Sequence, residues 1–184
     1  MKSAFTTILL IVSFNCAASD LYLIGEYGQS SFASGNSDSG KIAAGYRLAD
    51  HFAVELGAED LGKIVFKGAG ASDSVSAKAT SLVLVGSTII PNNGYEDHTF
   101  SVFYKLGMAR VTGNSSGVPG AVPGYTALGA PIWNSSKIGV TYGLGASYQL
   151  DTNWFLRLDG DVYKTGVETT GDISVLSAGV GYKF

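Results

Sequence analysis

The feature that most constrains the fold is a period of two: apolar residues recur at every second position through most of the chain after residue 20. The pattern is clearest in 41–48, 52–59, 99–109, 140–150 and 154–163. In each stretch one face carries large apolar side chains, such as Tyr142 and Leu144, and the other carries small, polar or charged ones, such as Thr141 and Gly143. Successive side chains of a strand point to opposite faces, so this period predicts β-strands.

The sequence predicts eight strands, and no stretch after residue 20 has a helical period. The strands cover 21–30, 41–48, 52–61, 78–90, 99–111, 137–150, 154–164 and 173–184. Their connections alternate in length: 49–51, 91–98 and 151–153 are short or moderate, whereas 31–40, 62–77, 112–136 and 165–172 are long. In an up-and-down sheet the long and short connections lie at opposite ends. Bacterial outer-membrane barrels have this asymmetry, with short turns on the periplasmic side.

The size of the apolar face decides which way it points. The interior of an eight-stranded barrel is just wide enough for side chains to fill. Five or six large residues from every strand would not fit there, so we expect the small and charged face to line the interior and the large apolar face to contact lipid. The prediction is an all-β, eight-stranded antiparallel up-and-down transmembrane β-barrel. In 78–90 the pattern leaves open whether Leu82 and Leu84 or Val83 and Val85 face the lipid.

The N-terminal segment has the organisation of a secretory signal peptide. Lys2 is followed by the apolar stretch FTTILLIVSF and then by small residues. Cleavage after Ala18 fits as well as cleavage after Ser19, so we expect residues 1–19 to be a cleaved signal and residues 20–184 to form the barrel domain. A buried first strand or a helical anchor is the alternative for this segment.

The composition excludes several classes of partner and chemistry. Charged residues make up 15% of the chain and the net charge is -3, which gives no indication of nucleic-acid binding. The single cysteine, Cys16, lies inside the predicted signal, so we expect a mature chain without disulfides or thiol chemistry. Lipidation of Cys16 is the alternative, but Asn15 stands where a lipoprotein signal needs a small residue.

The chain ends inside a strand instead of in a polar tail. Leu176, Ala178, Val180, Tyr182 and Phe184 are apolar at alternate positions. A terminal Phe with an aromatic residue two positions earlier resembles the C-terminal assembly signal of bacterial outer-membrane proteins. The resemblance implies that Tyr182 and Phe184 are recognised by the barrel-assembly machinery.

A second stretch strengthens this resemblance. GYRLADHFAVELGAEDLGK (45–63) resembles the second hairpin of the OmpA/OmpX-like family of small outer-membrane β-barrels, which includes opacity-like and porin-family proteins. The likeness covers nearly all of the predicted mature chain. It implies a monomer in the outer membrane of a Gram-negative bacterium, in contact with outer-membrane lipid and lipopolysaccharide. The implied role is membrane integrity and surface interaction, with adhesion or contact with a host-surface ligand through external loops. A small ion-conducting channel is the alternative.

The histidines give no support to a catalytic role. His51 and His98 both fall in the predicted periplasmic connections, whereas outer-membrane enzymes of barrel fold use a histidine near the outer end. A general base must lie within hydrogen-bonding reach of the proton that it takes. We therefore expect no enzyme, with no catalytic residue, cofactor or metal site, although a catalyst built from carboxylates alone stays open.

Charged side chains on the inward face indicate what fills the lumen. They are Glu26, Arg47, Glu55, Glu59, Lys105, Arg157, Asp159 and Asp161. They could form a gated ion path or proton relay, or an ion-paired plug. We favour the plug, because narrow barrels are filled and charges away from water need partners. Counting residues from the periplasmic end places Glu55 near Arg157. The same count places Lys105 near Glu26 and Asp159.

The longest connection, 112–136, is the candidate site of surface contact. It contains SSGVPGAVPGYTALGAPIW (115–133), in which two Pro-Gly pairs suit type II turns. The residues that we expect to be exposed there are Val118, Val122, Tyr125, Leu128, Ile132 and Trp133. An apolar loop on a cell surface indicates a contact site, and a loop that packs on itself is the alternative. Arg110 and Lys137 place positive charge near the outer leaflet, so lipopolysaccharide phosphate is a second candidate contact.

Overall fold

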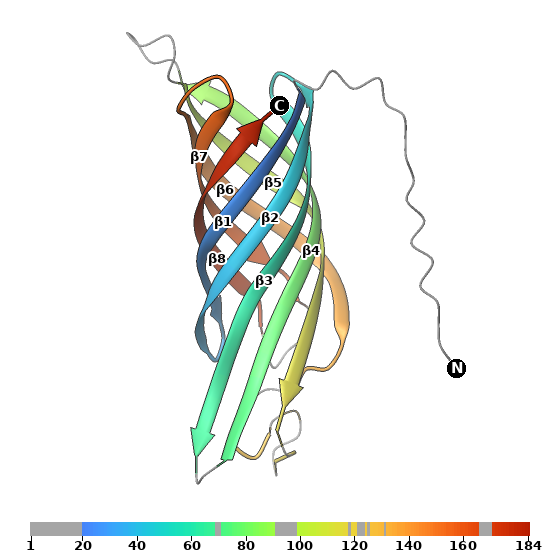
Figure 1. The fold of residues 1–184 in the computed structure, drawn as a ribbon. Helices are drawn as coiled ribbons and strands as arrows, with labels where there is room; N and C mark the ends of the chain where they lie inside the picture. The colour runs from blue at the N-terminus through green and yellow to red at the C-terminus, as the bar shows by residue number, and fades with distance from the viewer. Residues whose placement is uncertain are drawn as a thin grey trace, which may run out of the picture.

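The alternating sequence folds as eight antiparallel strands that close into a barrel (Figure 1), which confirms the predicted fold. The computed structural model describes residues 20–68, 71–90, 99–117, 119–120, 124, 126–130, 132–165 and 171–184, so the predicted signal peptide lies outside the described residues. The strands are β1 (Leu21–Phe32), β2 (Gly35–Ala49), β3 (Phe52–Gly68), β4 (Ala71–Ile90), β5 (Phe100–Ser116), β6 (Ser136–Gln149), β7 (Trp154–Tyr163) and β8 (Ile173–Lys183). Pairing of β1 with β8 closes the wall. In the described part of the chain, no helix has the length and apolarity to cross a membrane.

The two ends of the barrel differ. The start of β1 and the C-terminus lie at one end, together with the tight turns after β2 and β6 (Figure 1). The carboxylate of Asp151 accepts hydrogen bonds from the backbone N–H groups of Asn153 and Trp154, both at 2.8 Å, and so fixes the turn between β6 and β7. These bonds lower the pKa of Asp151. Because short turns face the periplasm in such barrels, we assign this end to the periplasmic side.

Two of the predicted long loops are wrong. Residues 31–40 and 62–77 are mostly strand: β1 pairs with β2 as far as Phe32↔Gly35, and β3 pairs with β4 as far as Gly68↔Ala71. Their Ser, Gly and Asp content resembles a loop, but a ladder of backbone hydrogen bonds needs no apolar side chains. The outer ends of β3 and β4 therefore project beyond the shorter strands (Figure 1). β5 likewise continues to Ser116 instead of ending at residue 111.

The projecting part of β3 starts at an irregularity. The β3–β4 register shifts between Asp60 and Lys63, and Gly62 has φ +87° there. A Cβ at Gly62 would lie 2.2 Å from the carbonyl oxygen of Asp38, so both the backbone angle and the space require glycine. The β2–β3 register ends at Gly40↔Asp60, just before this bulge.

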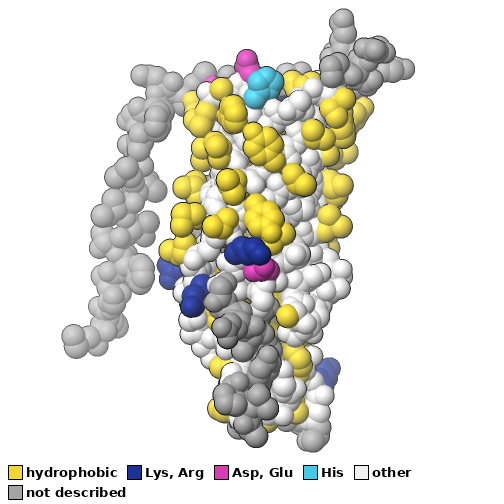
Figure 2. All heavy atoms as spheres, turned by 180° about the vertical axis from the view of Figure 1, so that it is seen from behind, with side chains coloured by type: hydrophobic (Ala, Val, Ile, Leu, Met, Phe, Trp, Pro, Cys, Tyr) yellow, Lys and Arg dark blue, Asp and Glu magenta, His cyan; other side chains and the backbone are white. Residues whose placement is uncertain are grey.

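Large apolar side chains point outward along the wall. Figure 2 shows hydrophobic side chains on the part of the barrel nearer the periplasmic end, with Lys, Arg and acidic side chains gathered at its outer limit. In β4, Leu82 is 57% exposed whereas Val83 is 8% exposed, so Leu82 and Leu84 face the lipid. At the periplasmic end, Tyr182 stacks edge-on with Trp154 and Phe184, with ring centroids 4.9 and 5.1 Å apart. Aromatic residues favour this interfacial level of a membrane.

The lumen is built in layers. Near the periplasmic end, the buried apolar residues are Tyr22, Ile24, Ala43, Val83, Val85, Phe103 and Phe155. Near the outer end, a second group, here called the outer apolar cluster, consists of Phe32, Leu61, Ala77, Ala79, Ala109, Val111, Trp133, Tyr163, Ile173 and Val175. Buried charged residues lie between the two groups, and they form the candidate site.

Candidate functional site

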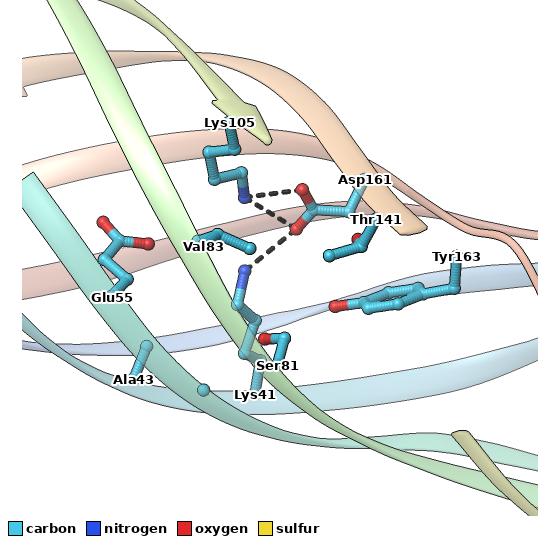
Figure 3. A pocket seen from close by; sticks show the side chains of 10 residues that line it. Lys41, Ala43, Glu55, Ser81, Val83, Lys105, Thr141, Asp161 and Tyr163 are labelled. Atoms are coloured by element: carbon cyan, nitrogen blue, oxygen red, sulfur yellow. Dashed lines mark hydrogen bonds and ion pairs between the residues drawn. The ribbon is translucent and has the colours of Figure 1, made fainter. Parts of the chain in front are cut away.

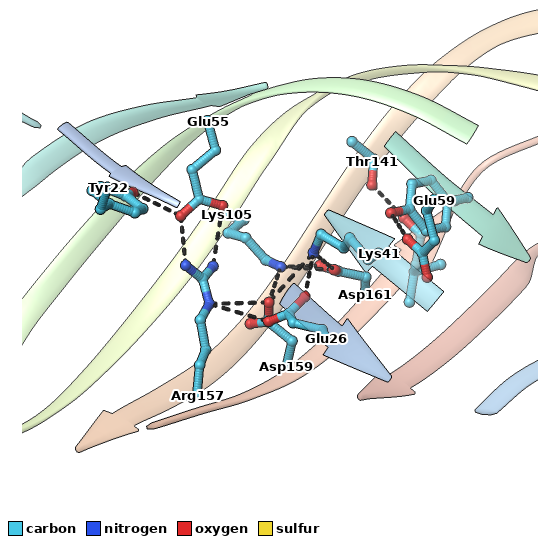
Figure 4. Close-up of polar contacts among 12 residues, drawn as sticks. Tyr22, Glu26, Lys41, Glu55, Glu59, Lys105, Thr141, Arg157, Asp159 and Asp161 are labelled. Carbon is cyan, nitrogen blue, oxygen red and sulfur yellow. Dashed lines mark hydrogen bonds and ion pairs between the residues drawn. The ribbon is translucent and has the colours of Figure 1, made fainter. Parts of the chain in front are cut away.

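The charged layer of the lumen is made by side chains from five strands. Its members are Glu26 on β1, Lys41 on β2, Glu55 on β3, Lys105 on β5, and Arg157, Asp159 and Asp161 on β7; each is at most 8% exposed. β7 supplies three of them because positions i, i+2 and i+4 of a strand share one face. Figure 4 shows these side chains pointing toward one another across the barrel.

Glycines opposite the charged residues make room for them. Gly143 pairs with both Lys105 and Asp161, and a Cβ on it would lie 2.2 Å from the Asp161 carboxylate. Gly179 pairs with Glu26 and Arg157, and a Cβ there would lie 2.7 Å from the Glu26 side chain. The inward glycines of β6 and β8 are therefore part of the layer.

On one side of the layer, Arg157 connects Glu55 with Asp159. Its guanidinium donates to both oxygens of Glu55, at 2.6 and 3.1 Å, and its Nε donates to Asp159 Oδ2 at 3.1 Å. The hydroxyl of Tyr22 donates to Glu55 Oε1 at 2.7 Å. The guanidinium also lies 4.2 Å from the centre of the Phe103 ring, within the range of a cation–π contact. Planar, two-pronged contacts of this kind are the strong form of arginine–carboxylate pairing.

Two lysines share the aspartates on the other side. Lys105 Nζ lies 2.6 Å from Asp161 Oδ1 and 2.9 Å from Asp159 Oδ2. Lys41 Nζ lies 2.9 Å from Asp161 Oδ2 and 3.0 Å from Glu26 Oε2. Figure 3 shows Lys41 and Lys105 converging on Asp161. Each cation therefore contacts two or more carboxylates.

The buried charges of the lumen do not balance. Glu59, which accepts a hydrogen bond from the hydroxyl of Tyr163 at 2.5 Å, adds a fifth carboxylate to four in the layer, against three cations. Both Glu26 oxygens and Asp159 Oδ1 are buried without a well-oriented hydrogen bond from a described residue. Buried carboxylates in excess of cations keep protons or bind water or cations. Glu26 meets Lys41 and Arg157 as ion pairs at 3.0 and 3.5 Å, so the side of the layer around Glu26 and Asp159 is the one with the fewest well-oriented hydrogen bonds.

Two spaces lie beside the charged layer, and the larger one is on the periplasmic side. A gap beside the layer, lined by Lys41, Glu55 and Lys105, has a volume of about 10 Å³ (Figure 3), which is room for about one water. A recess of about 270 Å³ opens toward the periplasmic end and is lined by Arg47 and Lys183, among others. Glu55 lines both spaces, so they lie on either side of its side chain.

Trp133, in the connection between β5 and β6, lies in the outer end of the lumen, which corrects one prediction. Trp133, predicted to be exposed, is 2% exposed and belongs to the outer apolar cluster. Its backbone N–H donates to Ser115 Oγ at 3.0 Å, and a Cβ on Gly113 would clash with its ring. The apolar indole is more stable when it is buried in the barrel mouth than when it is exposed to solvent. At this residue the structure is therefore closer to the alternative, a packed loop, than to an exposed contact site.

The other predicted contact residues are only partly described. Leu128 and Ile132 are half-buried, and the backbone N–H of Leu128 donates to Asp73 Oδ2 at 3.1 Å. Val118, Val122 and Tyr125 lie outside the described residues.

The structure brings together most of the predicted lumen charges. Glu26, Glu55, Lys105, Arg157, Asp159 and Asp161 lie in the layer, and Glu59 is held by Tyr163 next to it. Arg47 is the exception: it is exposed at the mouth of the periplasmic recess, because its position near the end of β2 leaves it beyond the filled lumen. Lys41 was missed, although it alternates with the outward Ile42 and so belongs to the inward face by the same rule.

The remaining predicted residues lie at the periplasmic end. His51 is exposed in the β2–β3 turn with Nδ1 3.1 Å from the carbonyl oxygen of Ser87, and His98 lies outside the described residues. Tyr182 and Phe184 pack against each other, and their role in assembly stays a prediction. Across the residues that the structure describes, no group of three or more His, Cys, Asp or Glu side chains is arranged to hold a metal ion.

Comparison with known proteins agrees with the geometry. A family model described as outer membrane protein beta-barrel domain matches residues 4–184. No curated protein matches the chain. Among solved structures, the N-terminal β-barrel domain of Pseudomonas aeruginosa OprF is 17% identical and has a TM-score of 0.59, covering 90% of this chain and 98% of that one.

Two further barrels are similar to a comparable degree. Ail, the attachment invasion locus protein of Yersinia pestis, solved with the heparin analogue sucrose octasulfate, is 16% identical with a TM-score of 0.58, over 90% of this chain and 99% of that one. Neisserial surface protein A is 18% identical with a TM-score of 0.54, over 89% and 97% of the two chains. At these identities the likeness shows the fold alone.

Proposed function

Since the chain belongs to the outer membrane protein beta-barrel domain family, we propose that it acts as a plugged barrel of the Gram-negative outer membrane, which contributes to membrane integrity and presents a surface for contact outside the cell. The family places the chain in the outer membrane. The plug and the external contact are the parts of the proposal that need tests.

The filled lumen is the observation that carries the proposal. Arg157 and the two lysines tie carboxylates from three strands across the lumen, and about 10 Å³ of space remains beside them. On the outer side the apolar cluster, including Trp133, occupies the mouth. An ion that crossed the lumen would have to displace both layers. Separating the partners of a buried ion pair costs several kcal/mol, so we expect such displacement to be rare. No catalytic step enters the proposal, because these buried acids and bases are engaged with one another.

Conductance tests the plug. The purified barrel, reconstituted in a planar lipid bilayer, should show no steady conductance above that of a mock preparation, purified in the same way from a strain that lacks the barrel. The mock preparation controls for contaminating porins. A steady conductance from the folded, heat-modifiable protein would contradict the plug and favour the second candidate function.

That second candidate, a small ion-conducting channel, has one observation in its favour. Glu55 and Arg157 line the recess of about 270 Å³ that opens on the periplasmic side. Conduction would then require only the charged layer and the outer cluster to rearrange. The same bilayer recording distinguishes the two functions.

For external contact, the projecting end of β3 and β4 is the better candidate surface, since Trp133 is buried. Past the end of the β2–β3 register, Lys63, Val65 and Lys67 are exposed on one face of β3. Val65 is 47% exposed between the two lysines. This arrangement offers an apolar centre flanked by positive charge, which suits an acidic ligand on a host surface.

Charge removal tests this surface. Bacteria that express the Lys63→Gln, Lys67→Gln variant should bind cultured epithelial cells less than bacteria with the wild-type barrel. The Arg110→Gln, Lys137→Gln variant removes the same charge near the membrane and serves as the matched control. Equal binding by both variants and by the wild type would remove the projecting hairpin from the proposal.

We also propose that the barrel-assembly machinery recognises Tyr182 and Phe184, as the terminal pattern implies. Deletion of Phe184 should lower the amount of barrel in the outer membrane more than it lowers the refolding yield in detergent. An equal loss in both measurements would make Phe184 a packing residue only.

A further inference from the structure

The recess at the periplasmic end of the lumen has a positively charged wall. Arg47 on β2 and Lys183 on β8 both line the recess, on the two strands that flank β1. Arg47 is close enough to the ammonium of Lys183 to repel it. In the described part of the chain, neither cation forms an ion pair with an acidic side chain. This wall is therefore the part of the recess that an anion would contact.

Lys183 is held in place without being neutralised. Its ammonium donates a hydrogen bond to Gln149 Oε1 and lies 5.4 Å from the centre of the Phe155 ring. The amide nitrogen of Gln149 donates to the carbonyl oxygen of Trp154 at 3.3 Å, which orients Oε1 toward Lys183. An ammonium has three N–H donors, and an amide oxygen occupies one of them. The side chain is thus positioned with donors left for a ligand in the recess.

The opposite wall, formed by β4, β5 and β6, carries hydroxyl groups and an exposed apolar side chain. Ser101 Oγ lies 2.7 Å from Ser147 Oγ, and Ile89 pairs with Ser101 on the neighbouring strand. Ile89 continues the inward face to which the buried Val85 belongs, yet it is 52% exposed and lines the recess. Transfer of such apolar surface from water to an apolar contact is favourable. This wall therefore suits the apolar part of a ligand.

The charge and the size of the recess limit what it can hold. The charged side chains that line it are Arg47, Asp50, Glu55, Arg157 and Lys183. Arg157 and Glu55 bind each other, so one acid, Asp50, remains against two cations. The volume of about 270 Å³ far exceeds the space of one water or inorganic ion. Small-molecule sites are commonly clefts with apolar side chains and a few converging polar groups, as here.

We propose that the recess binds, from the periplasmic side, a small organic anion whose carboxylate or phosphate group contacts Arg47 and Lys183 and whose apolar part covers Ile89. A guanidinium presents two parallel donors that match either anionic group, and an ammonium adds a point charge. A free inorganic ion would use the cations but would leave Ile89 in water. The site goes beyond the proposed function, because a plugged barrel needs no ligand in this recess.

Binding of benzoate and of phenyl phosphate to the purified barrel in phosphatidylcholine nanodiscs tests the site. Saturation-transfer NMR, with empty nanodiscs as the blank, measures such weak binding. The wild type should bind at least one of these anions about fivefold or more tightly than it binds uncharged benzamide, because hydrogen bonds to charged groups are the strong ones. The Arg47→Gln, Lys183→Gln variant should bind that anion about tenfold more weakly. The Lys63→Gln, Lys67→Gln variant has the same net charge, is altered at the opposite end of the barrel and should bind like the wild type.

A second variant keeps the test independent of assembly. Lys183 lies between the two residues of the predicted assembly signal, whereas Arg47 is exposed, so Arg47→Gln alone should fold with heat-modifiable migration in gels. It should bind the anion about threefold or more weakly than the wild type. Unchanged binding by Arg47→Gln, equal binding of benzamide, or equally tight binding of inorganic phosphate would each overturn the proposal. None of these outcomes depends on conductance or cell adhesion.

Discussion

The charged layer and the outer apolar cluster fill the same lumen by different means. In the charged layer, Arg157 meets Glu55 and Asp159 in fixed directions, so each partner depends on the others being present. In the outer cluster, the rings of Trp133 and Tyr163 fill volume beside alanines and branched residues. The first layer requires complete pairing, whereas the second requires complete packing. Substitutions that separate charge from volume can therefore test the two layers independently.

The largest effect should follow the loss of a cation from the charged layer. Arg157→Ala leaves Glu55 without its two-pronged partner in a lumen that already has surplus carboxylates. We expect the free energy of unfolding to fall by roughly 3–5 kcal/mol, as when one partner of a buried pair is removed. Denaturant unfolding in lipid vesicles, followed by gel migration, measures it. Arg110→Ala removes an exposed arginine and should change stability by less than about 0.5 kcal/mol; a similar loss in both variants would contradict the buried layer.

Loss of volume from the outer cluster should have the next largest effect. Trp133→Ala empties the barrel mouth and should lower stability by about 3 kcal/mol, the low end for a buried tryptophan, because the connection can partly collapse. Trp133→Phe keeps an aromatic ring and removes an indole N–H that is buried without a hydrogen-bond partner among the residues that the structure describes. That control should stay close to the wild type in the same unfolding measurement. If Trp133→Phe were as unstable as Trp133→Ala, the directional N–H would matter more than the volume.

A smaller effect is expected when the charged layer loses a carboxylate instead of a cation. Glu26→Gln keeps the shape and removes one negative charge from a lumen with five carboxylates and three cations. We expect a change of less than about 1 kcal/mol, in either direction, because the surplus charge of the layer decreases. A loss as large as that of Arg157→Ala would show that Glu26 is a fully charged partner of Lys41.

The two layers also differ in how far the sequence predicts them. The alternation rule places Glu55, Arg157 and Asp161 on the inner face, because parity along a strand decides the facing of each side chain. The same rule applies to Lys41, which precedes the outward-facing Ile42 but was not among the predicted lumen charges. The pairing of neighbouring strands in the closed barrel then sets these residues at the same height along the barrel axis.

Trp133 could not be placed in the same way. It lies in a connection, where no period relates sequence position to facing, and its burial depends on the chain folding back to Ser115. The projecting hairpin was missed for a related reason: residues 62–77 pair through their backbone, and their polar side chains carry no alternating signal. Apolar patterning therefore predicts the part of a barrel that lies in lipid better than the part beyond it.

The smallest change in the free energy of unfolding is expected for Asp151, which lies in a turn outside the lumen. Its pH dependence is a baseline against which that of variants in the two layers can be compared. The backbone N–H groups of Trp154 and Asn153 lower the pKa of Asp151 in the folded barrel. A carboxyl group whose pKa is lower when folded than when unfolded stabilises the fold above its unfolded pKa, near 4, and that contribution is lost as the pH falls through the folded pKa. Asp151→Ala should therefore reduce stability slightly at pH 7 and should not reduce it at a pH well below 4. Unfolding of the variant and the wild type at several pH values measures the difference. A difference that persisted at low pH would show that the turn, and not the charge of Asp151, is responsible.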